Sequence, residues 1–246
     1  MLARWLCVIA LLGACSPLAS HAALIIGGTR VIYPSDAREV SVQISNQGDS
    51  PSLMQAWIDR GDSNAQPDDS DVPFLILPPL SRVEPGGGQI LRLTFLGDDS
   101  LPTDRESVFW LNILDVPPAP ERSADANQPQ NILQLAIRSR VKLFYRPAAL
   151  ASQHPNESGM KLRWTVADGG RGIEAHNPTP FYVTLTQVDA MTADGANPLA
   201  FDDGMLAPGS RLALPLPTGV YPRQLRFTYI NDYGGRVTRD AQLTQP

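Results

Sequence analysis

The amino-acid sequence predicts an all-β protein built from two β-sandwich domains of the immunoglobulin type. Hydrophobic and polar residues alternate along much of the chain, which is the pattern of half-buried strands. The 23 prolines and 19 glycines among 246 residues separate short apolar runs and favour turns over long helices. No long stretch carries the apolar stripe of an amphipathic helix. Many short strands between regularly spaced turn signals are typical of such sandwiches.

The first half of the chain supplies one set of strand candidates. Val40, Val42 and Ile44 alternate with polar residues, and a glycine-rich turn at 85–88 precedes another alternating run. We expect strands at residues 40–44, 53–58, 74–77, 90–95, 108–114 and 132–144.

The second half resumes the same rhythm after a break. We expect strands there at residues 160–166, 173–175, 181–188, 212–214, 225–230 and 235–243. The segment between Pro147 and Pro155 is polar and bounded by proline, so it is the expected hinge. The predicted domains are therefore residues 23–148 and 156–246, joined by a linker at 149–155.

The start of the chain has the pattern of a cleaved secretory signal at residues 1–22. Arg4 precedes an apolar run that is too short to span a bilayer, and small residues lead to Ala22. We expect cleavage after Ala22, which removes both cysteines and leaves a mature chain without a disulfide. Two alternatives remain, a buried first helix and a lipid anchor on Cys15, whose context resembles a bacterial lipobox.

Composition excludes several classes of function. The net charge of −5 argues against a nucleic-acid surface and against a polybasic membrane patch, so we expect neither partner and no membrane insertion of the mature chain. Two cysteines and three histidines argue against thiol and zinc-cluster chemistry. There is no phosphate-cradling glycine motif, and we expect no cofactor and no metal.

No catalytic residues are predicted. His154 and His176 lie in a linker and beside a turn signal, without a nucleophile motif near either, so we interpret both as surface residues. The acidic run 68–71 lacks the glycine and distal glutamate of a calcium loop and is interpreted as a solvated loop. Neighbouring aspartates elsewhere do not by themselves indicate a glycosidase, because adjacency in sequence says nothing of facing geometry.

The segment 130–145 is unusual because it could form one strand of about fifteen residues, roughly 50 Å long, where five or six residues are average. Leu133, Leu135 and Ile137 share one face of it. Alternation alone leaves two interpretations open, in which these three residues either enter the core or extend beyond the sandwich.

Lys142 is the second unusual feature. The chain has eighteen arginines and only two lysines, yet one lysine lies inside this longest strand. An ammonium group is a compact charge with three donors and suits a single carboxylate. An ordinary surface lysine is the alternative interpretation.

Six blocks of sequence, in order, resemble the periplasmic pilus-assembly chaperones of the chaperone–usher pathway, the PapD-like family. The longest reads LPTDRESVFWLNILDVPP, and the blocks together span the mature chain at residues 28–30, 55–58, 101–118, 142–147, 177–181 and 229–235. The loop at 119–130 is longer than in compact members, and its acidic residues Glu121 and Asp125 have no derived role. The disulfide that some members carry in the second domain is absent.

The resemblance implies two sandwiches set at an angle with a cleft between them, and a non-enzymatic, ATP-independent function in the periplasm. The implied partners are pilus subunits, which lack one strand of their own sandwich, and an outer-membrane usher. Chaperones of this family donate a strand to the subunit. The resemblance therefore favours the interpretation in which the apolar row, Leu133, Leu135 and Ile137, extends beyond the sandwich. Whether the free protein caps itself as a homodimer is left open.

The resemblance also assigns individual residues. It implies that Leu133, Leu135 and Ile137 fill the subunit groove, and that Arg30 and Lys142 hold the subunit's terminal carboxylate. It implies further that Glu106, Arg146 and Asp232 form a buried charge cluster that orients the two domains. The alternative interpretation is that these residues form exposed ion pairs. The competing hypothesis for the whole protein is a secreted glycan-binding adhesin module, which an exposed aromatic platform would favour.

Overall fold

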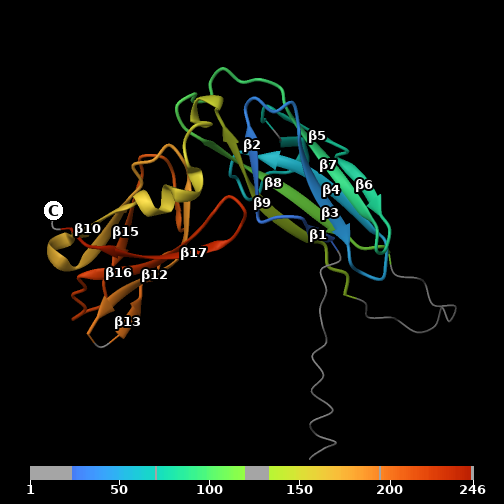
Figure 1. Ribbon diagram of the computed structural model, residues 1–246. Coiled ribbons are helices and arrows are strands. Elements are labelled where there is room, and N and C mark those ends of the chain that lie inside the picture. The colour runs from blue at the N-terminus through green and yellow to red at the C-terminus, as the bar shows by residue number, and fades with distance from the viewer. Residues whose placement is uncertain (1–23, 70, 120–132, 194, 245–246) are drawn as a thin grey trace, which may run out of the picture.

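The computed structural model describes residues 24–244, apart from residues 70, 120–132 and 194. The predicted signal at 1–22, with Cys15, lies outside the described residues, as do Glu121 and Asp125. The described chain forms two β-sandwiches set at an angle to each other, as Figure 1 shows. The predicted all-β fold of two sandwiches is confirmed.

The N-terminal sandwich consists of a four-stranded and a five-stranded sheet. The four-stranded sheet has the order β1-β3-β7-β5 and the five-stranded sheet the order β2-β9-β8-β4-β6. All pairings are antiparallel except that of β2 with β9, which is parallel. The strands are β1 (Leu24–Ile26), β2 (Arg30–Pro34), β3 (Val40–Asn46), β4 (Ser52–Asp59), β5 (Phe74–Leu77), β6 (Leu80–Val83), β7 (Gly88–Phe95), β8 (Ser107–Val116) and β9 (Ile137–Arg146), with a short 3₁₀ helix, η1 (Pro67–Asp69).

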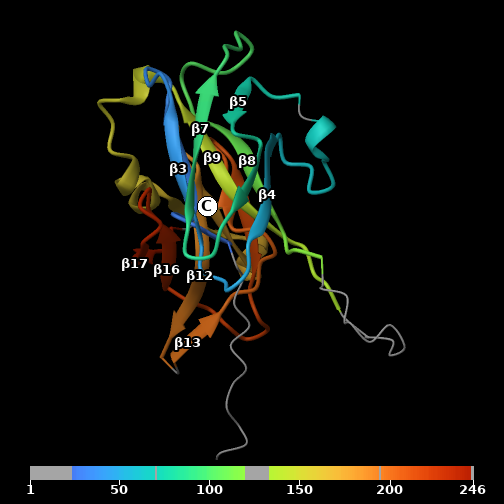
Figure 2. The ribbon, with the colours of Figure 1, turned by 90° about the vertical axis from the view of Figure 1, so that its right-hand side faces the viewer.

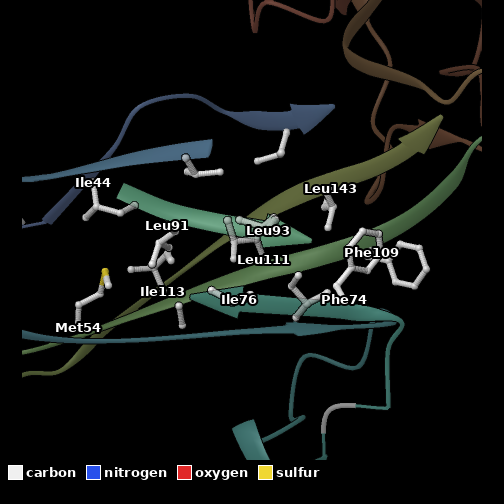
Figure 3. Packing of buried hydrophobic residues seen from close by; sticks show 14 of the residues in the cluster. Ile44, Met54, Phe74, Ile76, Leu91, Leu93, Phe109, Leu111, Ile113 and Leu143 are labelled. Atoms are coloured by element: carbon white, nitrogen blue, oxygen red, sulfur yellow. The ribbon is translucent and has the colours of Figure 1, made fainter. Parts of the chain in front are cut away.

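The core of this sandwich follows from the alternation seen in the sequence. Phe109, Leu111 and Ile113 of β8 point inward and are buried. They meet inward-pointing residues of the other sheet, including Leu91 and Leu93 of β7, as Figure 3 shows. Figure 2 shows the strands of this sandwich roughly aligned with one another along its length. Burial of this apolar surface stabilises the domain without any cross-link.

The first two strands belong to different sheets, which places Arg30 at the edge of the five-stranded sheet. β1 pairs with β3, and the chain then turns at Gly27 and Gly28 so that β2 pairs with β9. A side chain at Gly27 would lie 3.1 Å from the carbonyl oxygen of Gln43, so the turn needs glycine for its close approach. The sequence alone did not predict these two short strands.

The C-terminal sandwich is built in the same way. One sheet has the order β10-β11-β15 and the other the order β13-β12-β16-β17, with β14 also pairing with β12. Ile173, Val188 and Leu225 are among its fully buried residues. The strands are β10 (Arg163–Ala167), β11 (Gly172–His176), β12 (Val183–Thr192), β13 (Gly195–Pro198), β14 (Met205–Leu206), β15 (Arg211–Pro215), β16 (Gln224–Ile230) and β17 (Arg236–Gln242).

The connection between the sandwiches is more ordered than a simple polar hinge. It contains the 3₁₀ helices η2 (Ala148–Leu150) and η3 (Pro155–Lys161), and Leu150 is buried. The strand expected from residue 160 therefore begins only at Arg163, because proline at the start of η3 favours a helical turn. A further 3₁₀ helix, η4 (Asp168–Gly170), connects β10 and β11.

Candidate functional site

The residues predicted as an anion anchor lie together where the two domains meet. β2 runs parallel to β9 in a register that places Arg30 directly beside Lys142. Both side chains are half-buried, and each makes a hydrogen bond to the C-terminal domain. The sheet register therefore creates a cationic pair from positions more than a hundred residues apart.

Arg30 is only partly satisfied by its surroundings. One terminal nitrogen, Nη1, donates to the carbonyl oxygen of Ile230 at 3.2 Å, and the guanidinium lies over the Phe144 ring at 5.7 Å from its centroid. The Nε–H is buried and has no hydrogen-bond partner in the described part of the protein. Burial lowers the pKa of Arg30, although the charges of Asp232 and Glu106 oppose the effect. The group retains an unused donor and a full positive charge.

Lys142 is in a similar position. Its Nζ donates to the hydroxyl oxygen of Thr184, on β12 of the C-terminal domain, at 3.5 Å. The ammonium also lies 5.4 Å from the centroid of the Trp110 ring. Burial lowers the pKa of Lys142, and the neighbouring charge of Arg30 lowers it further, while Asp203 acts in the opposite direction.

Neither cation is neutralised by the described protein. No carboxylate oxygen of the described residues lies within 4.0 Å of Arg30 or Lys142. Two neighbouring, half-buried positive charges repel each other, and partial burial strengthens that repulsion relative to bulk water. Such a pair is suited to an anion that can accept hydrogen bonds from both.

The predicted charge cluster is assembled four residues further along β9, and it is neutralised. Arg146 Nε donates to Glu106 Oε1 at 2.8 Å, and Arg146 Nη1 donates to Asp232 Oδ2 at 2.8 Å. The second oxygen of Glu106 accepts the backbone N–H of Tyr182 at 2.8 Å. The side chains of Glu106 and Arg146 are 2% and 14% exposed, so these are not the exposed ion pairs of the alternative interpretation. Burial raises the pKa of Glu106, with Arg146 opposing it.

The three apolar residues before and at the start of β9 lie outside the core. The exposed fractions of Leu133, Leu135 and Ile137 are 82%, 62% and 45%. The neighbouring Gln134 side chain donates to the carbonyl oxygen of Pro117 at 2.8 Å. The sequence left two interpretations open for these residues, entry into the core or extension beyond the sandwich. In the described chain they do not enter the core.

The expectation of one long strand is wrong for the free chain. β9 begins at Ile137, which pairs with Asp115 near the end of β8, and residues 133–136 have no described neighbour to pair with. β2 covers β9 only from Lys142 onward. On that side, residues 137–141 therefore present unpaired backbone groups among the described strands. Figure 2 shows the chain before β9 extending beyond the end of the sheet.

The other polar candidates do not form a site. His154 is exposed before η3 and His176 ends β11, and the described residues contain no group of three or more His, Cys, Asp or Glu that could hold a metal ion. Within the same residues, no helix is long and apolar enough to cross a membrane. Sequence reasoning missed Thr184, because an isolated threonine in a distant strand carries no local signal.

Two family models match the chain in succession. Residues 23–151 match the family described as "Pili and flagellar-assembly chaperone, PapD N-terminal domain". Residues 157–241 match "Pili assembly chaperone PapD, C-terminal domain".

Relatives match over nearly their full length. The chain is 45% identical to "Chaperone protein FimB/FhaD" of Bordetella pertussis, covering 95% of this chain and 93% of the relative. It is 41% identical to "Probable fimbrial chaperone YadV" of Escherichia coli, covering 91% of each.

Solved structures share the arrangement. The CupB2 chaperone of Pseudomonas aeruginosa matches with a TM-score of 0.73 and 39% identity, covering 89% of this chain and all of the other. A structure described as the Salmonella enterica SafA pilin in complex with the SafB chaperone matches with a TM-score of 0.72 and 31% identity, covering 89% and 96%.

Proposed function

The chain belongs to the pilus-assembly chaperones of the chaperone–usher pathway, and from this we propose that it binds pilus subunits by donating a β-strand. The observation that carries the proposal is an exposed apolar row next to an open sheet edge that ends at a cationic pair. Together these features match a partner that lacks a strand and ends in a carboxylate. The role is binding and protection of a folding partner, not catalysis.

The open edge of β9 is the proposed attachment line for the subunit. Addition of a strand to an exposed edge supplies backbone hydrogen bonds, and pilus chaperones are themselves a known example of this mode. The unpaired stretch 137–141 continues the line that β2 occupies from Lys142 onward. A subunit strand bound there with its C-terminus at Lys142 runs in the same direction as β9. Residues 133–136 then gain the neighbour that they lack in the free chain.

The apolar row supplies most of the proposed binding free energy. Complete burial of Leu133, Leu135 and Ile137 contributes about 1.5–3 kcal/mol each, roughly 5–9 kcal/mol before the cost of ordering the segment. The residues between them face the opposite side of the strand. A shift of the pairing by one residue would therefore place Gln134 and Ala136 in the groove.

We propose that Arg30 and Lys142 fix the register in which the subunit strand pairs with β9. The terminal carboxylate of the subunit accepts hydrogen bonds from Arg30 and Lys142, each contributing about 1.5–3 kcal/mol in a partly dry site. The unpartnered Nε–H of Arg30 and the nearby hydroxyl of Thr184 support this role, because both offer donors at the junction. The carboxylate thus fixes where the subunit chain ends, which hydrophobic contacts cannot do.

We further infer the cellular route from the family. The protein acts in the periplasm after removal of residues 1–22, and it delivers the subunit to an outer-membrane usher. N-terminal sequencing of the secreted protein is expected to begin at Ala23. A lipidated Cys15 would contradict this route without affecting the subunit-binding proposal.

The direct test is co-elution with a purified pilus subunit in size-exclusion chromatography. We expect the wild-type protein to co-elute and Arg30→Ala or Lys142→Ala to reduce the fraction of co-eluting complex while circular dichroism remains unchanged. Lys161→Ala is the matched control, because Lys161 is the chain's other lysine and is exposed in the second domain. Unchanged co-elution of both cleft variants would overturn the carboxylate anchor.

The competing glycan-binding function lacks a structural basis. Trp57 and Trp164 are buried and Trp110 is covered in part by cationic side chains, so no described tryptophan forms an exposed platform. We expect a glycan array to show no saturable binding, and strong binding there would restore the adhesin hypothesis.

A further inference from the structure

Trp110 of β8 lies next to Lys142 of the proposed carboxylate anchor. Its ring centroid is 5.4 Å from the Lys142 ammonium and 4.7 Å from the guanidinium carbon of Arg140. In the β8–β9 ladder Trp110 is directly opposite Lys142, and Arg140 precedes Lys142 by two residues. All three side chains therefore project from the same face of the sheet.

Arg140 is held in place by a buried hydrogen-bond network. Arg140 Nη2 donates to Asp59 Oδ1 at 2.6 Å, and Arg140 Nε donates to Asn112 Oδ1 at 3.1 Å. Asn112 also donates to the other oxygen of Asp59, at 2.7 Å. Asp59 and Asn112 are 4% and 0% exposed. Arg140 is thus neutralised and fixed, unlike Lys142.

The Trp110 ring is also confined at its edge. Gly61 follows β4 with φ of 120° and donates its backbone N–H to Asp59 Oδ1 at 2.6 Å. A side chain at Gly61 would lie 3.7 Å from Trp110 Nε1, in contact with the indole. The ring is bordered by the glycine turn, by Arg140 and by Lys142, and this limits its rotamers.

We propose that Trp110 is a positioning residue for Lys142, holding the ammonium at the domain junction without neutralising it. The inference rests on the proposed carboxylate anchor and adds a specificity-determining residue to it. A lysine stem has four rotatable bonds and would otherwise extend its charge into water. The negative face of an indole attracts the ammonium over the distance observed here.

The choice of an aromatic ring has a chemical reason. A carboxylate at the position of Trp110 would pair with Lys142 and compete with the incoming subunit terminus. The ring compensates part of the lost hydration but leaves the ammonium's formal charge and its N–H donors free. Asp59 affects Lys142 indirectly, because it neutralises Arg140 and so limits the positive charge beside Lys142.

The test measures how well the protein distinguishes a C-terminal carboxylate from an amide. The probes are two synthetic peptides of alternating valine and serine that end in phenylalanine, identical except for a free or an amidated C-terminus. In calorimetry we expect the wild type to prefer the free carboxylate. Trp110→Leu is expected to reduce that preference about tenfold, which corresponds to about 1.4 kcal/mol, while the affinity for the amidated peptide stays unchanged.

Two further variants separate positioning from a structural role. Trp57→Leu is the matched control, because Trp57 lies on the same sheet under Arg138, whereas the Lys142 ammonium lies over Trp110. It is expected to leave the carboxylate preference intact. Trp110→Phe, which keeps an aromatic face, should restore most of the preference. Trp110→Met replaces Trp110→Leu if the leucine variant does not fold.

The outcomes distinguish the carboxylate anchor from the positioning role of Trp110. A wild-type protein that binds both peptides equally would refute the carboxylate anchor itself. A normal wild-type preference that Trp110→Leu or Trp110→Met retains would refute the positioning role and leave the anchor intact. Equal weakening of both peptides by Trp110→Leu would assign Trp110 a structural role only.

Discussion

Two cationic sites on β9 differ in one respect that separates stability from binding. Lys142 and Arg146 lie four residues apart on the same face of the strand, and both contact the C-terminal domain. Arg146 is bound by the carboxylates of Glu106 and Asp232. Lys142 and its neighbour Arg30 have no carboxylate within 4.0 Å in the described chain.

The difference indicates what each site does. Arg146 hydrogen-bonds to a carboxylate of each domain, and we propose that these bonds orient the two domains. A half-buried charge without a partner costs stability in the free protein. In the proposed function, the terminal carboxylate of the subunit supplies the missing anion.

The largest expected effect is on the neutralised site. Arg146→Met leaves Glu106 buried without its cation, so we expect the free energy of unfolding to fall by about 3–5 kcal/mol. Urea denaturation followed by circular dichroism measures this. Arg226→Met is a control, because Arg226 pairs with Asp240 at the surface and its loss should leave the free energy of unfolding nearly unchanged. A loss as small as the control's would mean that the cluster does not stabilise the interface.

The equivalent substitution at Lys142 should affect the binding of the pilus subunit. If Lys142 holds the subunit carboxylate as proposed, Lys142→Met removes one charge-assisted hydrogen bond worth about 1.5–3 kcal/mol and should lower subunit affinity about ten- to hundredfold. The free energy of unfolding should not fall, because the ammonium has no anionic partner to lose in the free protein. Calorimetric titration with a pilus subunit and urea denaturation test both halves. A large loss of stability would contradict the contrast between the sites.

A smaller effect is expected from the exposed apolar row. Leu135→Ala removes side-chain area that only the subunit would bury, so subunit affinity should fall about tenfold, or about 1.4 kcal/mol. Stability should not change, because Leu135 is 62% exposed in the free chain. Ala136→Ser, on the opposite face of the same segment, is the control for calorimetry. Equal effects of the two substitutions would argue against a groove-filling row.

Local patterns predicted the framework of the fold because burial imposes them. The alternating runs at 40–44 and 90–95 became β3 and β7, whose inward residues lie in one core. The short strands β1 and β2 were missed, since three to five residues give little pattern and β2 pairs with a strand far along the chain. The strand expected from residue 160 began late, because the preceding residues form a 3₁₀ helix.

The candidate site was less accessible to sequence reasoning. Lys142 was noticed because lysine is rare in this chain, but its pairing with Arg30 came only from the family resemblance. Thr184 and Trp110 complete the surroundings of Lys142 through contacts across domains and strands. Such contacts depend on register and on domain orientation, which periodicity does not specify.

The smallest expected effect concerns pH and uses the same pair of variants. Burial and Arg30 lower the pKa of Lys142 in the folded protein, with Asp203 opposing, so the folded state binds fewer protons there than the unfolded chain. Stability therefore rises with pH between the folded pKa and the unfolded value near 10.5. The difference in unfolding free energy between wild type and Lys142→Met should shift in favour of the wild type as pH rises through this window.

Taking the difference between the two proteins cancels the contributions of all other groups, because the two proteins share them. A bound peptide with a free C-terminal carboxylate should abolish the shift, because the added anion favours the charged ammonium and raises the pKa of Lys142 again. An amidated peptide should not. If the difference between the two proteins were independent of pH without peptide, Lys142 would be solvated as fully as an ordinary surface lysine. The distinction between the neutralised and the open site would then not hold.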